Sequence, residues 1–100
     1  MNARDMLANV PEALRPLLPE LLEVLESSLG AARGALVMGD REAAAREAHA
    51  LKGACMRFGL DGLAAHAARA EEALVAGEAG AARALDDFGA ALAELGPATR

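Results

Sequence analysis

Apolar side chains recur every three or four residues over most of the chain, which is the spacing of one face of an α-helix. The first such segment is expected from Pro19 to about Met38. Its inward positions are Leu18, Leu22, Leu25, Leu29, Ala32 and Leu36. Gly39 is expected to end this helix, and Asp40 to cap the start of the next one, because glycine suits helix C-termini and aspartate suits N-caps.

The second predicted helix covers about residues 41 to 58 and ends at Gly59. Its buried face is predicted to hold Ala44, Ala48, Leu51, Cys55 and Phe58. Asp61 is expected to cap a third helix that reaches about Ala76. A fourth helix is expected over about residues 80 to 95, with Gly96 and Pro97 stopping it and leaving a frayed tail.

The inward positions of these last two helices follow the same spacing. In the third helix they are Leu60, Leu63, Ala67, Ala70 and Leu74, and in the fourth Ala81, Leu85, Phe88, Leu92 and Leu95. Four helices of about four turns joined by turns of a few residues predict antiparallel neighbours. The predicted fold is therefore all-α, an up-down-up-down four-helix bundle over residues 18–96.

Residues 1–17 are expected to form a short helical lead-in against one end of the bundle. Pro11 is placed to begin a short helix, and Pro16 and Pro19 limit its length. The chain of 100 residues has room for a single core. Because 54% of its residues are hydrophobic but only 2% are aromatic, that core must consist mainly of Leu, Ala, Val and Met.

The single cysteine excludes an internal disulfide framework and indicates a reducing compartment. Cys55 falls on the predicted buried face and is interpreted as a small hydrophobic residue. The N-terminus lacks the basic start and apolar run of a signal peptide, and no segment approaches the ~20 apolar residues of a membrane span. We therefore expect a cytoplasmic protein that does not enter a membrane.

Charge is distributed unevenly along the chain, whose net charge is −5. This balance argues against a general partner for nucleic acid or anionic membranes. Residues 41 to 69 carry five basic against three acidic side chains, a local +2, whereas the remainder carries five basic against twelve acidic, or −7. A mildly basic region in the second helix suits a partner with an acidic active site.

The second helix also carries the chain's candidate chemistry. Helical geometry places His49 opposite the buried face, with Lys52 one turn away and only Ala45 and Gly53 directly above and below it. Glycine inside a helix is about 1 kcal/mol less favourable than alanine, so Gly53 is expected to give a partner steric access to His49.

The segment His49-Ala50-Leu51-Lys52-Gly53-Ala54-Cys55-Met56-Arg57-Phe58-Gly59 resembles the signature of histidine-containing phosphotransfer (HPt) domains. The run from Leu63 to Leu74 is similar to the family as well, so the resemblance covers roughly residues 18 to 95. One departure is Ala54, where many members carry a small hydroxyl residue.

This resemblance implies a phosphorelay protein of two-component signalling. His49 would carry a phosphoryl group to or from the aspartate of response-regulator receiver domains, and a hybrid histidine kinase would be a further partner. Lys52 is expected to stabilise the phosphoryl charge. The chain is expected to need no cofactor of its own, with Mg²⁺ on the receiver. It lacks a Gly-rich nucleotide loop and is therefore expected to be a phosphocarrier without kinase activity.

Four further residues of the second helix are candidates for docking a partner: Ala45, Arg46, Met56 and Arg57. Two other readings of the chain stay open. One is an adaptor or inhibitor that binds a receiver or kinase domain without being phosphorylated, and the other is the phosphoacceptor domain of a larger kinase. No metal site is predicted, because His49 and His66 lack further ligands at suitable spacing. A hydrolase is disfavoured because Ser27 and Ser28 have no convincing triad.

Overall fold

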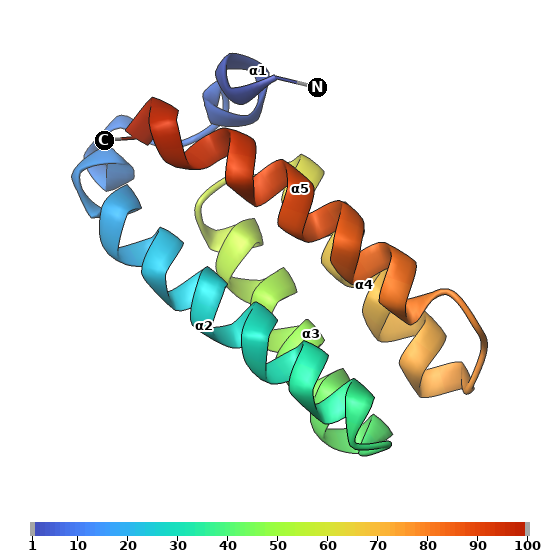
Figure 1. Cartoon of the computed structure of the whole chain (residues 1–100). Coiled ribbons are helices and arrows are strands. Elements are labelled where there is room, and N and C mark those ends of the chain that lie inside the picture. The colour runs from blue at the N-terminus through green and yellow to red at the C-terminus, as the bar shows by residue number, and fades with distance from the viewer. Residues whose placement is uncertain (1, 100) are drawn as a thin grey trace.

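The computed structural model describes residues 2 to 99 and folds them into helices joined by short connections (Figure 1). The helices are α1 (Ala3–Leu7), a 3₁₀ helix (Glu12–Leu17), α2 (Leu18–Val37), α3 (Arg41–Arg57), α4 (Asp61–Ala76) and α5 (Ala81–Thr99). No strand occurs among these described residues, so the predicted all-α class is confirmed.

The four long helices, α2 to α5, enclose one hydrophobic core in an elongated body of 38 × 20 × 19 Å. Helix α3 packs between α2 and α4, and α5 packs against both α4 and α2. Helix α1 lies across one end, where it contacts α5 and α4 (Figure 1). The predicted lead-in therefore does cover one end of the bundle.

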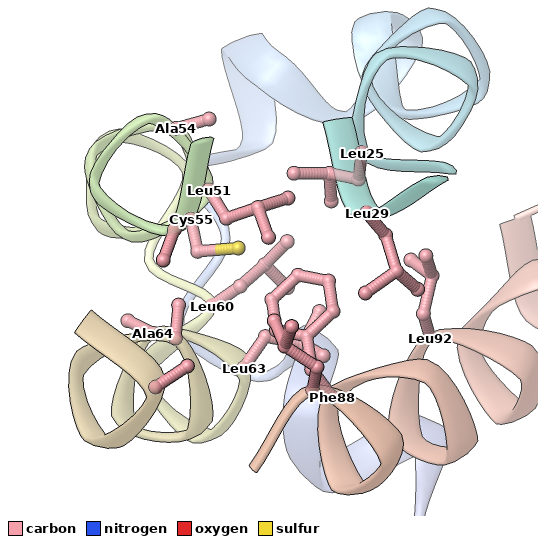
Figure 2. Close-up of a cluster of buried hydrophobic side chains, with 14 of the residues drawn as sticks. Leu25, Leu29, Leu51, Ala54, Cys55, Leu60, Leu63, Ala64, Phe88 and Leu92 are labelled. Carbon is pink, nitrogen blue, oxygen red and sulfur yellow. The ribbon is translucent and has the colours of Figure 1, made fainter. Parts of the chain in front are cut away.

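The core is built from leucines and alanines around the single aromatic ring of Phe88, which is fully buried. In Figure 2 this ring from α5 faces Leu25 and Leu29 of α2 and the Leu51 and Cys55 side of α3. Cys55 is fully buried, and this burial raises the pKa of its thiol to about 12. Its predicted role as a small hydrophobic residue is confirmed.

Of the two N-cap residues predicted from the sequence, one is observed in the structure and the other is not. Asp40 caps α3 as predicted, because its carboxylate accepts a hydrogen bond from the backbone N–H of Ala43 at 3.1 Å. The prediction that Asp61 caps the next helix is wrong. Leu60 holds the N-cap position of α4, anchored by its complete burial, and Asp61 is the first helical residue. There a carboxylate still interacts favourably with the helix dipole.

The end of the fourth helix also differs from the prediction. Instead of stopping near residue 95, α5 continues through Gly96 and Pro97 to Thr99. Gly96 is buried at the end of the bundle that α1 covers, and the Thr99 hydroxyl donates a hydrogen bond to its carbonyl at 3.0 Å. A proline in the last turn removes only one backbone hydrogen-bond donor. The stabilisation from packing at this end of the bundle is larger than that loss.

Two residues predicted on inward faces are only half-buried. Leu36 lies in the last turn of α2, and Phe58 occupies the C-cap of α3. Both positions lie next to the connections, where the neighbouring helix no longer covers the side chain. The 3.6-residue period therefore predicts burial at the other inward positions, including Leu18 and Ala81 at the starts of helices, and fails only for these two side chains at helix C-termini.

The backbone of the lead-in closes directly over the connection between α3 and α4. Gly59 has a φ of +73°, and a Cβ placed on it would overlap the carbonyl oxygen of Asn9. On the same side the Asn9 amide donates a hydrogen bond to the Asp61 carboxylate at 3.5 Å. Gly59 is thus required both for its left-handed conformation and for the approach of the lead-in.

We expect Gly59→Ala to lower the free energy of unfolding by about 2–3 kcal/mol, measured by urea denaturation. Gly39→Ala is the matched control, because its φ is +77° but a Cβ there meets nothing within 4 Å. It should show only the conformational part, about 1 kcal/mol. Equal losses in the two variants would contradict a contribution from the lead-in contact.

Candidate functional site

His49 stands in the middle of α3, on the side that faces away from the core. The opposite side of the helix holds Ala44, Ala48, Leu51 and Cys55, all fully buried, which fixes the rotation of α3 about its axis. The imidazole is 67% exposed. The expected orientation of His49 toward solvent is therefore what the structure shows.

A carboxylate from the neighbouring helix lies directly beside this imidazole. Glu71 of α4 places Oε2 2.7 Å from the His49 Nδ1 and Oε1 2.6 Å from the Lys52 Nζ. Each carboxylate oxygen thus has one partner, and both partners come from α3. The Glu71 side chain is 19% exposed, so the cluster lies between α3 and α4 rather than in bulk solvent.

The contacts of Glu71 keep its carboxylate ionised. Its pKa is lowered, chiefly by the hydrogen bond from Lys52; the hydrogen bond from His49 acts in the same direction and partial burial opposes them. An ionised carboxylate can only accept hydrogen bonds. The proton shared between His49 and Glu71 therefore belongs to the imidazole Nδ1.

This hydrogen bond selects one tautomer of His49. When Nδ1 carries the proton of a neutral imidazole, the other ring nitrogen, Nε2, has a free electron pair. The side chain's exposure leaves that nitrogen open to a partner. An imidazole that is hydrogen-bonded at Nδ1 and open at Nε2 can act as a nucleophile through Nε2. The Glu71 carboxylate is the group that orients it.

The backbone beside His49 is uncrowded, as the glycine suggested. A Cβ on Gly53 would meet only the Arg57 guanidinium, at 3.9 Å, which is an ordinary contact. Ala45, on the preceding turn, is half-buried and small. The turns before and after His49 therefore carry only small side chains that would not block a reacting group. The role of Gly53 in this access stays a prediction.

The remaining residues singled out in the sequence lie around the site without contacting His49 in any recorded hydrogen bond or ion pair among the described residues. Arg46, Met56 and Arg57 are exposed on α3. Lys52, expected to be a cation for a phosphoryl group, is instead paired with Glu71 and only 30% exposed. In this structure its charge is directed to the Glu71 carboxylate.

Sequence reasoning did not find Glu71. The signal was the register of the helical pair: His49 and Glu71 each lie about three helical turns from the Gly59–Leu60 connection, on opposite sides of it. Residues at equal distances from a short connection lie at about the same level along two packed helices, and those on the facing sides can meet. A charge or hydrogen-bond partner for His49 could have been sought there.

His66, the other histidine, has a different environment. Its Nδ1 contacts the Arg69 guanidinium, which can only donate, so Nδ1 carries no proton. Its pKa is lowered, first by burial and then by the charge of Arg69, while Asp87 acts in the opposite direction. Within the described residues 2 to 99, no group of three or more His, Cys, Asp or Glu side chains is placed to hold a metal ion.

Comparison with known protein families shows which family has this fold and this histidine-bearing helix. The family model described as Hpt domain matches residues 12–97. The chain belongs to the HPt domain family. No curated protein and no solved structure shows a match to it. HPt domains act as phosphocarriers in phosphorelays and have no kinase activity of their own, which agrees with the resemblance found in the sequence around His49.

Proposed function

We propose that this HPt protein carries a phosphoryl group on His49 Nε2, to or from the aspartate of a response-regulator receiver domain. The observation that supports this most directly is the contact of Nδ1 with Glu71, which leaves Nε2 as the free, exposed nitrogen. A hybrid histidine kinase is the proposed source of the phosphoryl group.

In the transfer step the Nε2 electron pair attacks the phosphorus of an aspartyl phosphate. The N–P bond forms as the acyl P–O bond breaks, and the aspartate carboxylate leaves with the bonding electrons. The imidazole then carries a positive charge that the Glu71 carboxylate stabilises through Nδ1–H, 2.7 Å away. The reverse step returns the phosphoryl group to a second aspartate.

Transfer of this kind depends on position and charge more than on covalent machinery. Lys52 would shift from Glu71 toward the phosphoryl oxygens, and Gly53 would leave room for them. Mg²⁺ is proposed to stay with the receiver domain. On this view the protein is a phosphocarrier that relies on its partners at both steps, and it neither binds ATP nor phosphorylates itself.

We further infer that α2 to α5 run up-down-up-down, because the connections span only residues 38–40, 58–60 and 77–80. Within the described part of the chain, the apolar stretches of the helices are too short for a membrane span. A cytoplasmic location is proposed on the ground that receiver domains and kinase catalytic domains act there.

The proposal is tested by mixing the protein with each phosphorylated receiver domain of its source organism. We expect at least one receiver to transfer label to the protein as an acid-labile, base-stable phosphoramidate, which mass spectrometry places on the peptide containing His49. Stable receiver binding without any transfer of label would contradict the relay and favour an unphosphorylated adaptor.

A further inference from the structure

The side of the bundle opposite His49 carries a groove of about 410 Å³ between α2 and α5 (Figure 1). Helix α3 contacts α2 and α4, and α5 contacts the same two helices, so the α2–α5 side lies opposite the α3–α4 pair that holds His49 and Glu71. The groove is lined by Glu26, Leu29, Gly30 and Arg33 of α2 and by Gly89, Leu92 and Ala93 of α5. A molecule bound there would leave the phosphoacceptor uncovered.

The floor of this groove is apolar, and its α2 side is open. Leu29 and Leu92, which lie next to each other in Figure 2, are buried beneath it. Gly30 is exposed, and a Cβ placed on it would meet nothing within 4 Å. The Arg33 guanidinium lies at the edge, where it is held by Asp86 at 3.3 Å. An apolar side chain can therefore enter beside Gly30 without displacing an existing contact of that residue.

Gly30 and Gly34 lie one helical turn apart on the exposed side of α2. A Cβ at Gly34 would also meet nothing within 4 Å, so contacts within the described chain do not require glycine at either position. Glycine is less favourable than alanine inside a helix. Its use there is accounted for by the close approach of another backbone, which glycine permits.

The same face of α2 also carries a projecting apolar side chain. Val37 is 86% exposed, the highest value among the large hydrophobic residues that the structure describes, and Met38 beside it is nearly as exposed. Val37 follows Gly30 by seven residues, so it lies on the same side of α2, two turns and about 10 Å away. One face thus holds an apolar side chain and an apolar groove. A contact between two identical surfaces related by a two-fold axis requires this self-complementarity.

We propose that this face binds a second copy of the chain, with the two α2 helices antiparallel and Val37 of each copy seated in the groove beside Gly30 of the other. Gly34 then lies close to the two-fold axis, where the helices approach each other most closely. This inference does not depend on phosphoryl transfer. It leaves the His49 side of both copies free.

The charges of α2 favour the antiparallel orientation. Its first half carries three exposed glutamates and no basic residue: Glu20, Glu23 and Glu26. A parallel pair of α2 helices would bring these carboxylates next to the same carboxylates of the second copy. The antiparallel pair instead brings Glu26, four residues before Gly30, to about the level of Arg41 of the second copy, four residues after Val37. Opposite charges at that level favour this register.

The area available indicates a dimer of moderate affinity. A stable protein–protein contact covers about 800 Å² on each partner. Helix α2 has 20 residues and is therefore about 30 Å long and 10 Å wide, which is less than that area. The α5 residues of the groove must contribute as well. We expect a dissociation constant of about 10–100 μM.

A larger groove, of about 500 Å³ between α4 and α5, does not suit an apolar side chain of a second copy. Its lining includes five charged side chains: Arg69, Glu72, Glu78, Arg83 and Asp87. The smaller groove between α2 and α5 has only two charged residues in its lining, Glu26 and Arg33.

Sedimentation equilibrium from about 5 to about 500 μM tests the proposal. Val37→Gln removes the projecting side chain and Gly30→Gln fills the groove, and we expect each to raise the dissociation constant at least tenfold. Val75→Gln is the matched control, because it changes a valine that is 71% exposed on α4, outside the groove. Its dissociation constant should stay within about twofold of wild type. Circular dichroism checks that all three variants are folded.

Two results would overturn the second copy as the occupant. One is a wild-type protein that stays monomeric over the whole range; loss of receiver or kinase binding in Val37→Gln would then assign the face to that partner. The other is a dimer that Val37→Gln and Gly30→Gln leave unchanged.

Disulfide trapping tests the antiparallel arrangement. Gly30→Cys and Val37→Cys are prepared as separate proteins and mixed in oxidised glutathione; the native Cys55 is fully buried and does not compete. We expect the linked dimer of the two different variants to form about tenfold faster than either variant links to itself. Faster linkage of each variant to itself would overturn the antiparallel arrangement.

Discussion

A protein carrying His49→Gln will accept no phosphoryl group from a receiver domain that labels the wild type. Glutamine keeps a polar side chain of similar length, but its amide nitrogen has no electron pair available for attack on phosphorus. The side chain is exposed and makes no core contact, so the fold should be unchanged. Transfer of radiolabelled phosphate, followed by gel electrophoresis, measures the loss, which we expect to be at least a thousandfold.

His66→Gln provides the matched control for this loss. His66 lies on α4, where its Nδ1 contacts Arg69 and leaves the proton on the other ring nitrogen. We therefore expect the His66 variant to be labelled within about twofold of wild type. Label that persisted in His49→Gln and disappeared in His66→Gln would show that the wrong histidine had been assigned.

The helices could be predicted from the sequence because burial in their interiors follows a simple period. Leu25, Leu51 and Leu63 all occupy predicted inward positions and are fully buried. The errors lie where local signals compete with tertiary packing. Pro97 is a helix breaker by its chemistry, yet α5 continues past it because α1 covers that end of the bundle. Such a contact joins the two ends of the chain and leaves no local trace.

The candidate site was predictable to the same extent. The exposure of His49 follows from the rotation of α3, which its own buried face determines. Glu71 was missed because its position relative to His49 depends on how α4 slides and rotates against α3. Composition around His49 indicated a basic surface, whereas the structure places an ionised carboxylate at its centre. The charges counted along the sequence near His49 therefore described α3 and its neighbourhood in the chain. They did not include the Glu71 carboxylate that α4 brings to the site.

The role of this carboxylate leads to the second large effect. We expect Glu71→Ala to slow transfer from the receiver about tenfold to a hundredfold, because the imidazole loses both its orientation and the anion that stabilises its positive charge. Without an acceptor at Nδ1, the two neutral tautomers of His49 compete, and one of them places the proton on the attacking nitrogen. Lys52 also loses its partner at 2.6 Å. Rapid-quench measurement at saturating receiver isolates this effect on the chemical step.

Glu72→Ala is the matched control, because it removes the same charge from the next position of α4, where the side chain is exposed and lines the groove facing α5. Its transfer rate should remain within about twofold of wild type. Nitrogen-15 NMR of the His49 ring adds a readout that a purely structural role would not move. The Nδ1–H tautomer should dominate in wild type and Glu72→Ala and decline in Glu71→Ala.

The effect of Glu71 on stability should depend on pH in a defined direction. Its pKa is lowered from 4.5 in the folded protein, so the stabilisation that it provides is present above that value and is lost as the pH falls through the lower folded pKa. The melting temperature of Glu71→Ala should therefore lie below that of wild type at pH 7, and the difference should shrink as the pH falls below 4.5. A wild-type rate and an unchanged tautomer in Glu71→Ala would show that the carboxylate only joins α3 to α4. A slowed rate with a shifted tautomer would assign it the positioning of His49.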